Sequence, residues 1–439
     1  MLSFHNYVII IAQIIGVKKS DKGGGKRMGY QTENTLQKRK DRVRAAINLR
    51  EGDRVPFAPK VNLVYAQDAG ISNYEAYSDW RNMKPGVEKF LSKYEVDMFW
   101  APADYPIKVM EVLGTTAIKW PGQTWGIDRN MGFQVTDASY LSEDEYDELI
   151  KDPSHYFMTK LYPRRHAKLQ ALSRMSWKNV IEFGHYAGMA QFADPDVRQA
   201  LLTLMAAGDQ AAQWLADQNE LCQTALAYET PLGCILGQNA PYDMLADGIR
   251  GYLDVPMDLF EIPEKVLAAI DVMTDMALEN VEGIAAAGMD YCFMPLHGGT
   301  DDFMSYDTYM EYYLPSLRKV IEKELELGIT PYIFFEGKYH TRLEILRDEF
   351  PKGIIAMFEQ IDIAKAKKVL GDHMCICGNL AGATLAYGKP EEVIEETKKM
   401  LDICAPGGGF IMDCSIVMDH YNEANFDAWY ETTLKYGNY

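Results

Sequence analysis

Short apolar runs recur along the chain from residue 54 onward, separated by longer segments with helical periodicity. Each run is apolar at almost every position, which is typical of strands buried on both faces of a parallel sheet. We therefore predict eight strands, at Val55–Pro59, Val96–Ala101, roughly Leu232–Leu236, Tyr291–Leu296, Pro331–Phe335, Ile354–Phe358, Met374–Cys377 and Gly409–Asp413.

Helical segments separate the last five runs, at Tyr306–Gly328, Thr341–Glu349, Ile363–Leu370 and Pro390–Cys404. Regular alternation of strand and helix indicates parallel strands joined by right-handed crossovers. With eight strands, this α/β pattern favours a (β/α)8 TIM barrel. A doubly wound open sheet is the alternative, although no G-x-G-x-x-G motif follows the first strand.

A long segment, about residues 115–225, separates the second and third predicted strands. We interpret it as a helical insertion that caps the barrel mouth, so that residues 28–439 form a single barrel domain. Residues 1–27 are expected to lie outside that domain, because the apolar run at 7–16 leads into a basic, glycine-rich stretch and Met28 opens a more ordinary start. A frayed N-terminal arm is the alternative.

The composition is that of a globular protein, with 48% hydrophobic and 24% charged residues in 439. A net charge of −19 argues against a nucleic-acid-binding protein. The ten-residue run at 7–16 is too short for a bilayer core that needs about 20 residues, so we expect no membrane association. Seven cysteines, four of them in the last 65 residues, fit a reducing cytoplasm better than a disulfide framework and leave thiols available for a metal.

Polar residues with metal-ligand chemistry follow several predicted strands, at the ends where a barrel of this kind carries its active site. Imidazole, carboxylate and thiolate are the ligands that zinc accepts, and a catalytic zinc keeps one position open. We predict a metal site drawn from His297, Glu336, Cys377 and Cys414, with Glu359 and Asp302 as catalytic residues beside it.

Each of these residues also has a structural interpretation. A buried cysteine is more often a small core residue than a ligand, and a histidine after a strand is often only hydrogen-bonded. Glu336 is harder to explain structurally, because burying a carboxylate without a partner is costly. Cys375 and Cys377 are two residues apart, about 6.6 Å along a strand, whereas two zinc-bound sulfurs lie at most about 4 Å apart, so a regular strand does not let both bind one metal. Cys377 is the better candidate, because Gly378 and Asn379 mark the end of the strand.

Substrate-binding candidates come from the first predicted strands and from an aromatic residue after the fifth. Aromatic side chains near strand ends can line a flat apolar pocket. The candidates are Lys60, Trp100, Asp104, Tyr105 and Tyr339.

The segment Gly353–Tyr439 resembles the uroporphyrinogen decarboxylase superfamily. The resemblance rests on IDIAKAKKVLGD, CGNLAGATLAYGKPEEVIEETKKMLD and GGGFIMD, and on Asn239–Asp243 followed by Ile249–Gly251, which is similar to the third-strand region. It extends over about residues 35–439. It implies a (β/α)8 barrel.

Two chemistries occur in the superfamily. Its decarboxylases bind a tetrapyrrole through an Arg-rich loop after the first strand, whereas this chain has Pro56–Lys60 there. Its zinc methyltransferases hold the metal by His-x-Cys after strand five and by Cys after strand eight. Here Phe334 and Glu336 occupy the strand-five positions and Cys414 the strand-eight position, so the resemblance implies a modified site completed by His297 or Cys377.

The motifs FEGKYHTRLE, MFEQIDI and CICGN are most similar to the anaerobic branch that includes O-demethylases of methoxylated aromatic compounds. The resemblance implies a methyltransferase that moves a methyl group from an aryl methyl ether to the Co(I) of a corrinoid protein, with zinc as the Lewis acid. Methyl transfer from a methylamine, thiol or quaternary amine, a metal-free decarboxylase, and a non-catalytic corrinoid-binding scaffold are the alternatives. The decarboxylase requires cations that bind carboxylates, for which Lys60, Lys338 and Arg342 are the candidates.

Overall fold

The computed structural model describes residues 35–102, 105–176 and 185–439. Five parallel strands form its main sheet, in the order β3-β4-β5-β6-β7, and β1 pairs with β2 in a separate antiparallel pair. The strands are β1 (Ile118–Lys119), β2 (Gln134–Val135), β3 (Tyr291–Leu296), β4 (Thr330–Lys338), β5 (Ile355–Gln360), β6 (Cys375–Cys377) and β7 (Phe410–Ile411).

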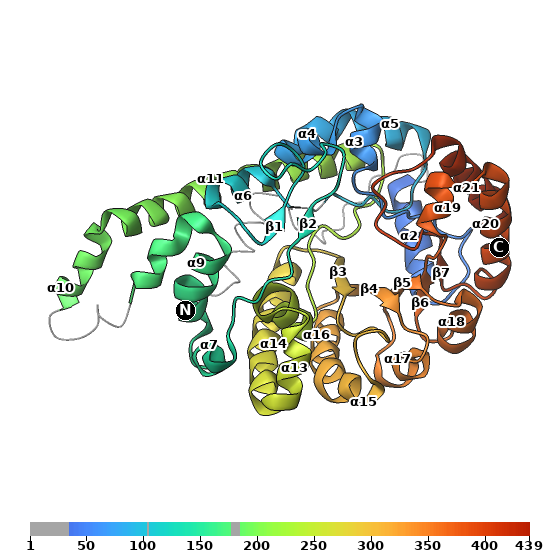
Figure 1. Cartoon of the computed structure of the whole chain (residues 1–439). Helices are drawn as coiled ribbons and strands as arrows, with labels where there is room; N and C mark the ends of the chain where they lie inside the picture. The colour runs from blue at the N-terminus through green and yellow to red at the C-terminus, as the bar shows by residue number, and fades with distance from the viewer. Residues whose placement is uncertain (1–34, 103–104, 177–184) are drawn as a thin grey trace, which may run out of the picture.

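Helices surround this sheet (Figure 1). Before the sheet come α2 (Thr35–Ile47), α3 (Val64–Ala69), α4 (Asn73–Ser78), η1 (Trp80–Met83), α5 (Lys84–Lys93), α6 (Ile107–Leu113), η2 (Glu143–Glu145), α7 (Tyr146–Lys151), α8 (Pro153–Tyr156), η3 (Phe157–Leu161), α9 (Tyr162–Arg165), η4 (Ala167–Arg174), α10 (His185–Gly188), η6 (Met189–Ala193), α11 (Pro195–Ala227), α12 (Pro241–Leu245), η7 (Ala246–Arg250), α13 (Asp254–Glu261) and α14 (Pro263–Ala286). Between and after its strands come α15 (Tyr306–Thr308), η8 (Tyr309–Tyr313), α16 (Leu314–Glu326), α17 (Leu343–Glu349), α18 (Ile363–Leu370), α19 (Gly382–Tyr387), α20 (Pro390–Cys404) and α21 (Glu423–Tyr436).

Parallel backbone pairing continues beyond both edges of the five-stranded sheet. Past β7, Phe57 pairs with Met412, and the amide of Asp97 donates to the carbonyl of Phe57. Past β3, Gly237 pairs with Phe293, and Leu232 in turn pairs with Phe99. The three earliest predicted strands are therefore single bridges in this structure, whereas the last five are strands of one sheet.

The two faces of the sheet pack against different surroundings, because successive strand side chains point to opposite faces. Cys292, Met294 and Leu296 of β3 join the large core that includes the helices. Tyr332, Phe334 and Met357 lie on the opposite face, in a smaller group of buried residues that we call the inner-face cluster. Its other buried members are Val43, Ala46, Ala58, Met98, Trp100, Cys234, Ile355, Cys375, Cys377 and Ile411.

The segment between α6 and the Leu232 bridge contains the predicted insertion. It begins with the β1–β2 pair and ends with α11, a helix of 33 residues. Figure 1 shows the N-terminal part of α11 extending away from the sheet, with α10 at its far end. Residues 1–27, predicted to lie outside the fold, are not among the described residues.

A buried carboxylate joins α2 to the first two predicted strands. Asp97 is fully buried, and its Oδ2 accepts hydrogen bonds from Arg54 Nη1 and from the amide of Phe57, both at 2.8 Å. Its Oδ1 accepts from Arg42 of α2. Both arginines are also buried, so loss of this carboxylate would leave Arg54 without its ion-pair partner and Arg42 with only the half-exposed Asp53.

We expect Asp97→Ala to lower the free energy of unfolding by about 3–5 kcal/mol, because removing one partner of a buried ion pair strands the other. Asp41→Ala on α2 is the matched control. Its side chain is 58% exposed and pairs with Arg44, and such surface pairs contribute about 1 kcal/mol or less. Urea unfolding midpoints measure both changes, and equal shifts in the two variants would contradict the role assigned to Asp97.

Candidate active site at the ends of β3 and β4

A buried carboxylate fixes the backbone where β3 ends. Asp243 of α12 is fully buried, and it accepts hydrogen bonds from the amides of His297 (3.0 Å) and Gly298 (2.9 Å). The Tyr313 hydroxyl donates to the same carboxylate at 2.7 Å. A Cβ at Gly298 would come within 2.8 Å of the Tyr242 ring, so the close approach of this loop requires glycine. Asp243 therefore determines where His297 leaves the strand.

Both ring nitrogens of His297 face carboxylates. Its Nδ1 lies 2.8 Å from Oδ2 of Asp247 in η7, and its Nε2 lies 3.3 Å from Oε2 of Glu336 in β4. The His297 side chain is 33% exposed and that of Glu336 is 47% exposed, so a small molecule can reach the pair. Side chains two or four residues apart on a strand point to the same face, so His297 lies on the face of Phe293 and Glu336 on the face of Phe334. Both phenylalanines pack in the inner-face cluster.

This environment raises the pKa of His297. Burial alone lowers it, but hydrogen bonds to Asp247 and Glu336 and the charges of Asp247 and Asp243 outweigh burial and raise it to about 11. The ring is therefore an imidazolium at neutral pH, with a proton on each nitrogen. Burial raises the pKa of Asp243 to about 6, against the lowering effect of the His297 charge.

Glu359 supports the chain beside Glu336. Its Oε2 accepts a 2.6 Å hydrogen bond from the amide of Gly337, where φ is +84° and the pairing of β4 with β5 shifts register. The predicted strand ended at Phe335, whereas β4 extends to Lys338, so Glu336 lies within the strand. In the structure Glu359 thus positions the Glu336–Gly337 backbone.

Asp302 lies apart from these contacts. Its side chain is 57% exposed and pairs with Lys338 at 3.1 Å. The neighbouring Asp301 accepts hydrogen bonds from the amide and hydroxyl of Thr341 and lies 3.4 Å from Arg342.

The two predicted cysteine ligands face different surroundings. Cys377 belongs to the inner-face cluster, where its Sγ lies 2.9 Å from the Tyr332 hydroxyl and 3.7 Å from Asp413 Oδ2. Cys414 packs in the core on the other face and donates to the carbonyl of Ile416. Burial, the largest cause in each case, raises the pKa of both thiols well above the usual value. Among the described residues, no group of three or more His, Cys, Asp or Glu side chains is arranged to hold a metal ion.

Lys60 and Trp100 meet on the inner face. The Lys60 ammonium lies over the Phe293 ring and 4.9 Å from the centre of the Trp100 ring, while its backbone amide donates to the buried carboxylate of Asp413. Burial raises the pKa of Asp413 to about 6, against its hydrogen bonds and the charge of Lys60.

The other substrate-binding candidates are spread out. Tyr105 is 40% exposed and packs edge-on against Phe133. Tyr339 is fully buried against Phe335, so it supports the core of the molecule. Asp104 lies outside the described residues.

Sequence reasoning missed Asp243, Asp247, Tyr332 and Asp413. Asp243 and Asp247 lie four residues apart, a spacing that places two side chains on one helical face. That spacing was the available signal, but it does not reveal that β3 ends beside them.

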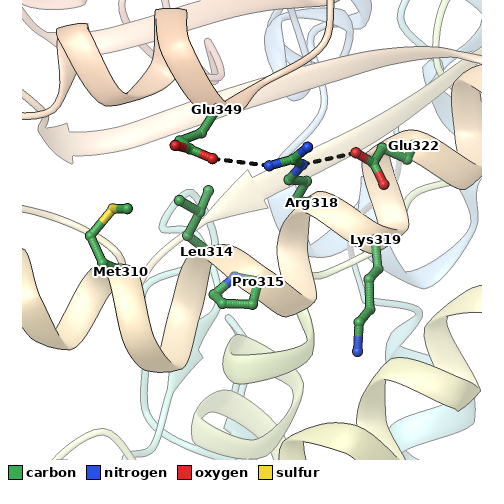
Figure 2. A pocket seen from close by; sticks show the side chains of 7 residues that line it. All are labelled: Met310, Leu314, Pro315, Arg318, Lys319, Glu322 and Glu349. Carbon is green, nitrogen blue, oxygen red and sulfur yellow. Dashed lines mark hydrogen bonds and ion pairs between the residues drawn. The ribbon is translucent and has the colours of Figure 1, made fainter.

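Figure 2 shows a pocket of about 330 Å³ that is lined mainly by side chains of α16. Arg318 there pairs with Glu322 and Glu349, at 2.8 and 2.9 Å. No predicted site residue lines this pocket, so we do not assign the chemistry to it. Its lining residues are Met310, Leu314, Pro315, Arg318, Lys319, Glu322 and Glu349.

Residues 181–433, more than half of the chain, match the family described as Uroporphyrinogen decarboxylase (URO-D). The chain therefore belongs to the uroporphyrinogen decarboxylase family.

Curated relatives match over part of their length. The uroporphyrinogen decarboxylase of Geobacter metallireducens is 30% identical over 176 residues, 40% of this chain and 50% of that protein. The protein from Chlorobium phaeobacteroides named uroporphyrinogen decarboxylase is 28% identical over 32% of this chain and 42% of its own length. The methylcobamide:CoM methyltransferase MtaA of Methanosarcina barkeri is 27% identical over 35% of this chain and 44% of that protein. The chain thus spans half or less of the length of these relatives.

A solved structure described as a methyltransferase from Methanosarcina mazei has a similar fold. The TM-score is 0.58 with 14% sequence identity, over 90% of this chain and 98% of that one. Within the described residues, no helix is both long enough and apolar enough to cross a membrane.

The ion pairs of His297 should make stability depend on pH with a definite sign. A pKa raised from about 6.5 to about 11 gives a contribution that is complete below pH 6.5 and is lost as the pH rises through 11. We expect the melting-temperature difference between the wild-type protein and His297→Gln to be largest near pH 6 and to shrink toward pH 11.

His166→Gln is the matched control for that experiment. Burial, with the charge of Arg165, lowers the pKa of His166 to about 4, so its contribution is lost as the pH falls from 6.5 to 4 and is constant above pH 7. If the melting-temperature difference between the wild-type protein and His297→Gln stayed constant from pH 6 to 11, the His297 ring would not be an imidazolium at neutral pH.

Proposed function

We propose that this chain is a methyltransferase that moves a methyl group from a small methylated donor, most directly an aryl methyl ether, to the Co(I) of a corrinoid carried by a partner protein. Family membership and the partial similarity to MtaA support the class. The observation that carries the proposal is the histidine held between Asp247 and Glu336 at the accessible ends of the strands.

The parallel pairings support a closed arrangement of strands. We propose that they form a (β/α)8 barrel, because pairing runs from β7 through Phe57 to the segment at 97–99, then through Leu232 and Gly237 back to β3. The proposed site then lies at the C-terminal ends of the strands, where such barrels carry their chemistry. The insertion that ends in α11 is the proposed cap.

The charge around His297 favours a donor without several carboxylates. Asp243, Asp247 and Glu336 surround the one imidazolium, so the site is acidic at neutral pH and repels a polycarboxylate such as a porphyrinogen.

The cations that a decarboxylase would need are engaged elsewhere. Lys338 pairs with Asp302, and Arg342 is buried with hydrogen bonds to the carbonyls of Thr300 and Met304. Lys60 is buried among the aromatic rings on the inner face.

The reaction consumes one proton, because an aryl methyl ether, Co(I) and a proton give a phenol and a methylated corrinoid. We assign the proton to Nε2 of His297. A donor oxygen that replaces the Glu336 carboxylate beside Nε2 receives the proton as the methyl group leaves, which avoids a free phenolate. Asp247 keeps the ring oriented through Nδ1, and Glu359 holds the Glu336–Gly337 backbone.

The resemblance implies a zinc ion, but only two of the four candidate ligands, His297 and Glu336, lie close enough to share one. His297 Nε2 and Glu336 Oε2 are 3.3 Å apart, about the separation of two ligands on one tetrahedral zinc, and Asp247 on Nδ1 is the usual partner of a zinc-bound histidine. Cys377 and Cys414 lie in different buried clusters and are hydrogen-bonded within them. No three of the four candidate ligands lie together in the described residues, and we derive no step through zinc.

Substitution of the central pair tests the proposed role. We expect His297→Ala to lower kcat/KM at least about 100-fold, the typical contribution of a positioned acid or base. Glu336→Ala should lower kcat/KM less, because Glu336 raises the pKa of His297 but leaves Nε2 when the donor binds. The assay follows release of phenol from methoxybenzenes with cob(I)alamin as the methyl acceptor. Methylamines, thiols and quaternary amines in the same assay identify the donor class.

The matched control for these two variants is Glu395→Ala, an exposed acid on α20, which should retain wild-type kcat/KM. Release of CO2 from a carboxylated substrate without methyl transfer would overturn the proposal in favour of the decarboxylase.

Elemental mass spectrometry of variants tests whether Glu336 or Cys414 holds any bound metal. The Cys414 thiol donates a hydrogen bond to the carbonyl of Ile416, so we expect Cys414→Ser to keep the metal content of the wild-type protein. We expect the amount of bound zinc to fall in Glu336→Ala. Loss of zinc from Cys414→Ser would show instead that Cys414 is a ligand of the metal.

A further inference from the structure

Backbone pairing between β3 and β4 stops just short of His297 and Glu336. The last paired residues of the two strands are Leu296 and Phe335, which directly precede them. The side chains of His297 and Glu336 are 33% and 47% exposed, so the surrounding packing alone does not hold their 3.3 Å contact. Asp243 ties His297 to α12, and a further set of contacts has to fix the histidine relative to β4.

Arg342 supplies part of that set from its buried position directly before α17. Its side chain is 1% exposed, and its Cζ lies 4.2 Å from the centre of the Tyr309 ring in η8. Its Nη2 donates hydrogen bonds to the carbonyls of Thr300 at 3.1 Å and Met304 at 2.7 Å. These carbonyls are the two ends of one turn, because the amide of Met304 donates to the carbonyl of Thr300. Arg342 therefore holds the loop that follows His297.

Asp301 ties the same loop to the end of β4. Its amide donates to the carbonyl of the last residue of β4 at 2.8 Å. Its carboxylate accepts from the amide and the hydroxyl of Thr341, at 3.1 and 2.7 Å, and lies 3.4 Å from Nε of Arg342. We call Asp301, Thr341 and Arg342 the loop clamp. The clamp joins the segment that carries His297 to the strand that carries Glu336.

The clamp needs an arginine at position 342, because a positive charge alone is not sufficient. Two different nitrogens of the guanidinium are used, Nη2 for the carbonyls and Nε for Asp301, while the group lies over the Tyr309 ring. A lysine has one nitrogen at the end of its side chain and cannot occupy both positions.

The geometry points to Arg342 as a positioning residue, which keeps Nε2 of His297 beside Glu336 by clamping the loop after β3 to the end of β4. Its effect on turnover rests on the proposed methyl transfer, whereas its effect on the His297 ring does not.

The kinetics of Arg342→Lys test this role, because the variant keeps the charge and loses one donor position. We expect kcat for phenol release to fall at least about tenfold, with KM changed about twofold or less, since a misplacement of about 1 Å costs up to about 100-fold. The loss should disappear in the His297→Ala background, because Arg342 acts through His297 and the two effects are then not additive. A purely structural loss would add to that of His297→Ala.

The ring signals of His297 give a second measurement that needs no substrate. In protein labelled with ¹⁵N at its histidines, the NMR signals of this ring are identified by their loss in His297→Gln. They should shift in Arg342→Lys at pH 7, because Nε2 loses its contact with Glu336. Arg347→Lys in the adjoining α17 is the matched control, since the Arg347 side chain is 48% exposed and pairs with Asp372 at 3.1 Å. It should keep wild-type kcat and ring signals.

Thr341→Val weakens the clamp from the surface, so the test does not depend on folding of the buried arginine variant. It removes the hydroxyl that donates to Asp301, and it should shift the ring signals and lower kcat by less than Arg342→Lys. Melting temperatures confirm that each variant is folded at the assay temperature.

The positioning role is overturned if the His297 ring signals are unshifted in both Arg342→Lys and Thr341→Val. It is also overturned if the loss of kcat persists undiminished in the His297→Ala background. If the wild-type protein transfers no methyl group, the proposed function fails and the ring signals alone decide the role of Arg342.

Discussion

The position of the proposed reactive histidine depends on one buried carboxylate. The Asp243 carboxylate accepts hydrogen bonds from the backbone amides of His297 and Gly298 and from the Tyr313 hydroxyl. With the backbone fixed there, Nδ1 meets Asp247 and Nε2 meets Glu336. Residues from α12, η7, β4 and the loop after β3 therefore act as one unit, and the raised pKa of His297 follows from their arrangement.

The sequence predicted best the elements with strong local signals. The segments Ile363–Leu370 and Pro390–Cys404 were predicted as helices at their observed bounds, the first capped by Asp362 and the second opened by proline. The predicted strand Tyr291–Leu296 also has its observed bounds, because its residues are apolar on both faces. Each of these signals lies within a few residues of the element it defines.

The earliest predicted strands form only isolated bridges, and particular residues in their sequences explain why. Val55–Pro59 includes two prolines, which cannot donate to a sheet. In the third run, a Cβ at Gly233 would lie 2.5 Å from the Met98 side chain, so two segments approach too closely for an ordinary side chain. The site was likewise half predictable. His297 and Glu336 became candidates because each follows a predicted strand, although β4 continues past Glu336. Asp243 and Asp247 join the candidate site only through tertiary contacts.

Methyl transfer is the central claim, and following the methyl carbon tests it most directly. A methoxybenzene labelled with ¹³C in its methyl group is mixed with cob(I)alamin and the purified protein, and the label is followed by NMR. The account predicts that the label moves to the corrinoid with one phenol released per methyl group, and that His297→Ala slows this transfer. The same experiment is run with labelled methylamines, thiols and quaternary amines. The account would be contradicted if the label stayed on every one of these donors while a carboxylated substrate lost CO2.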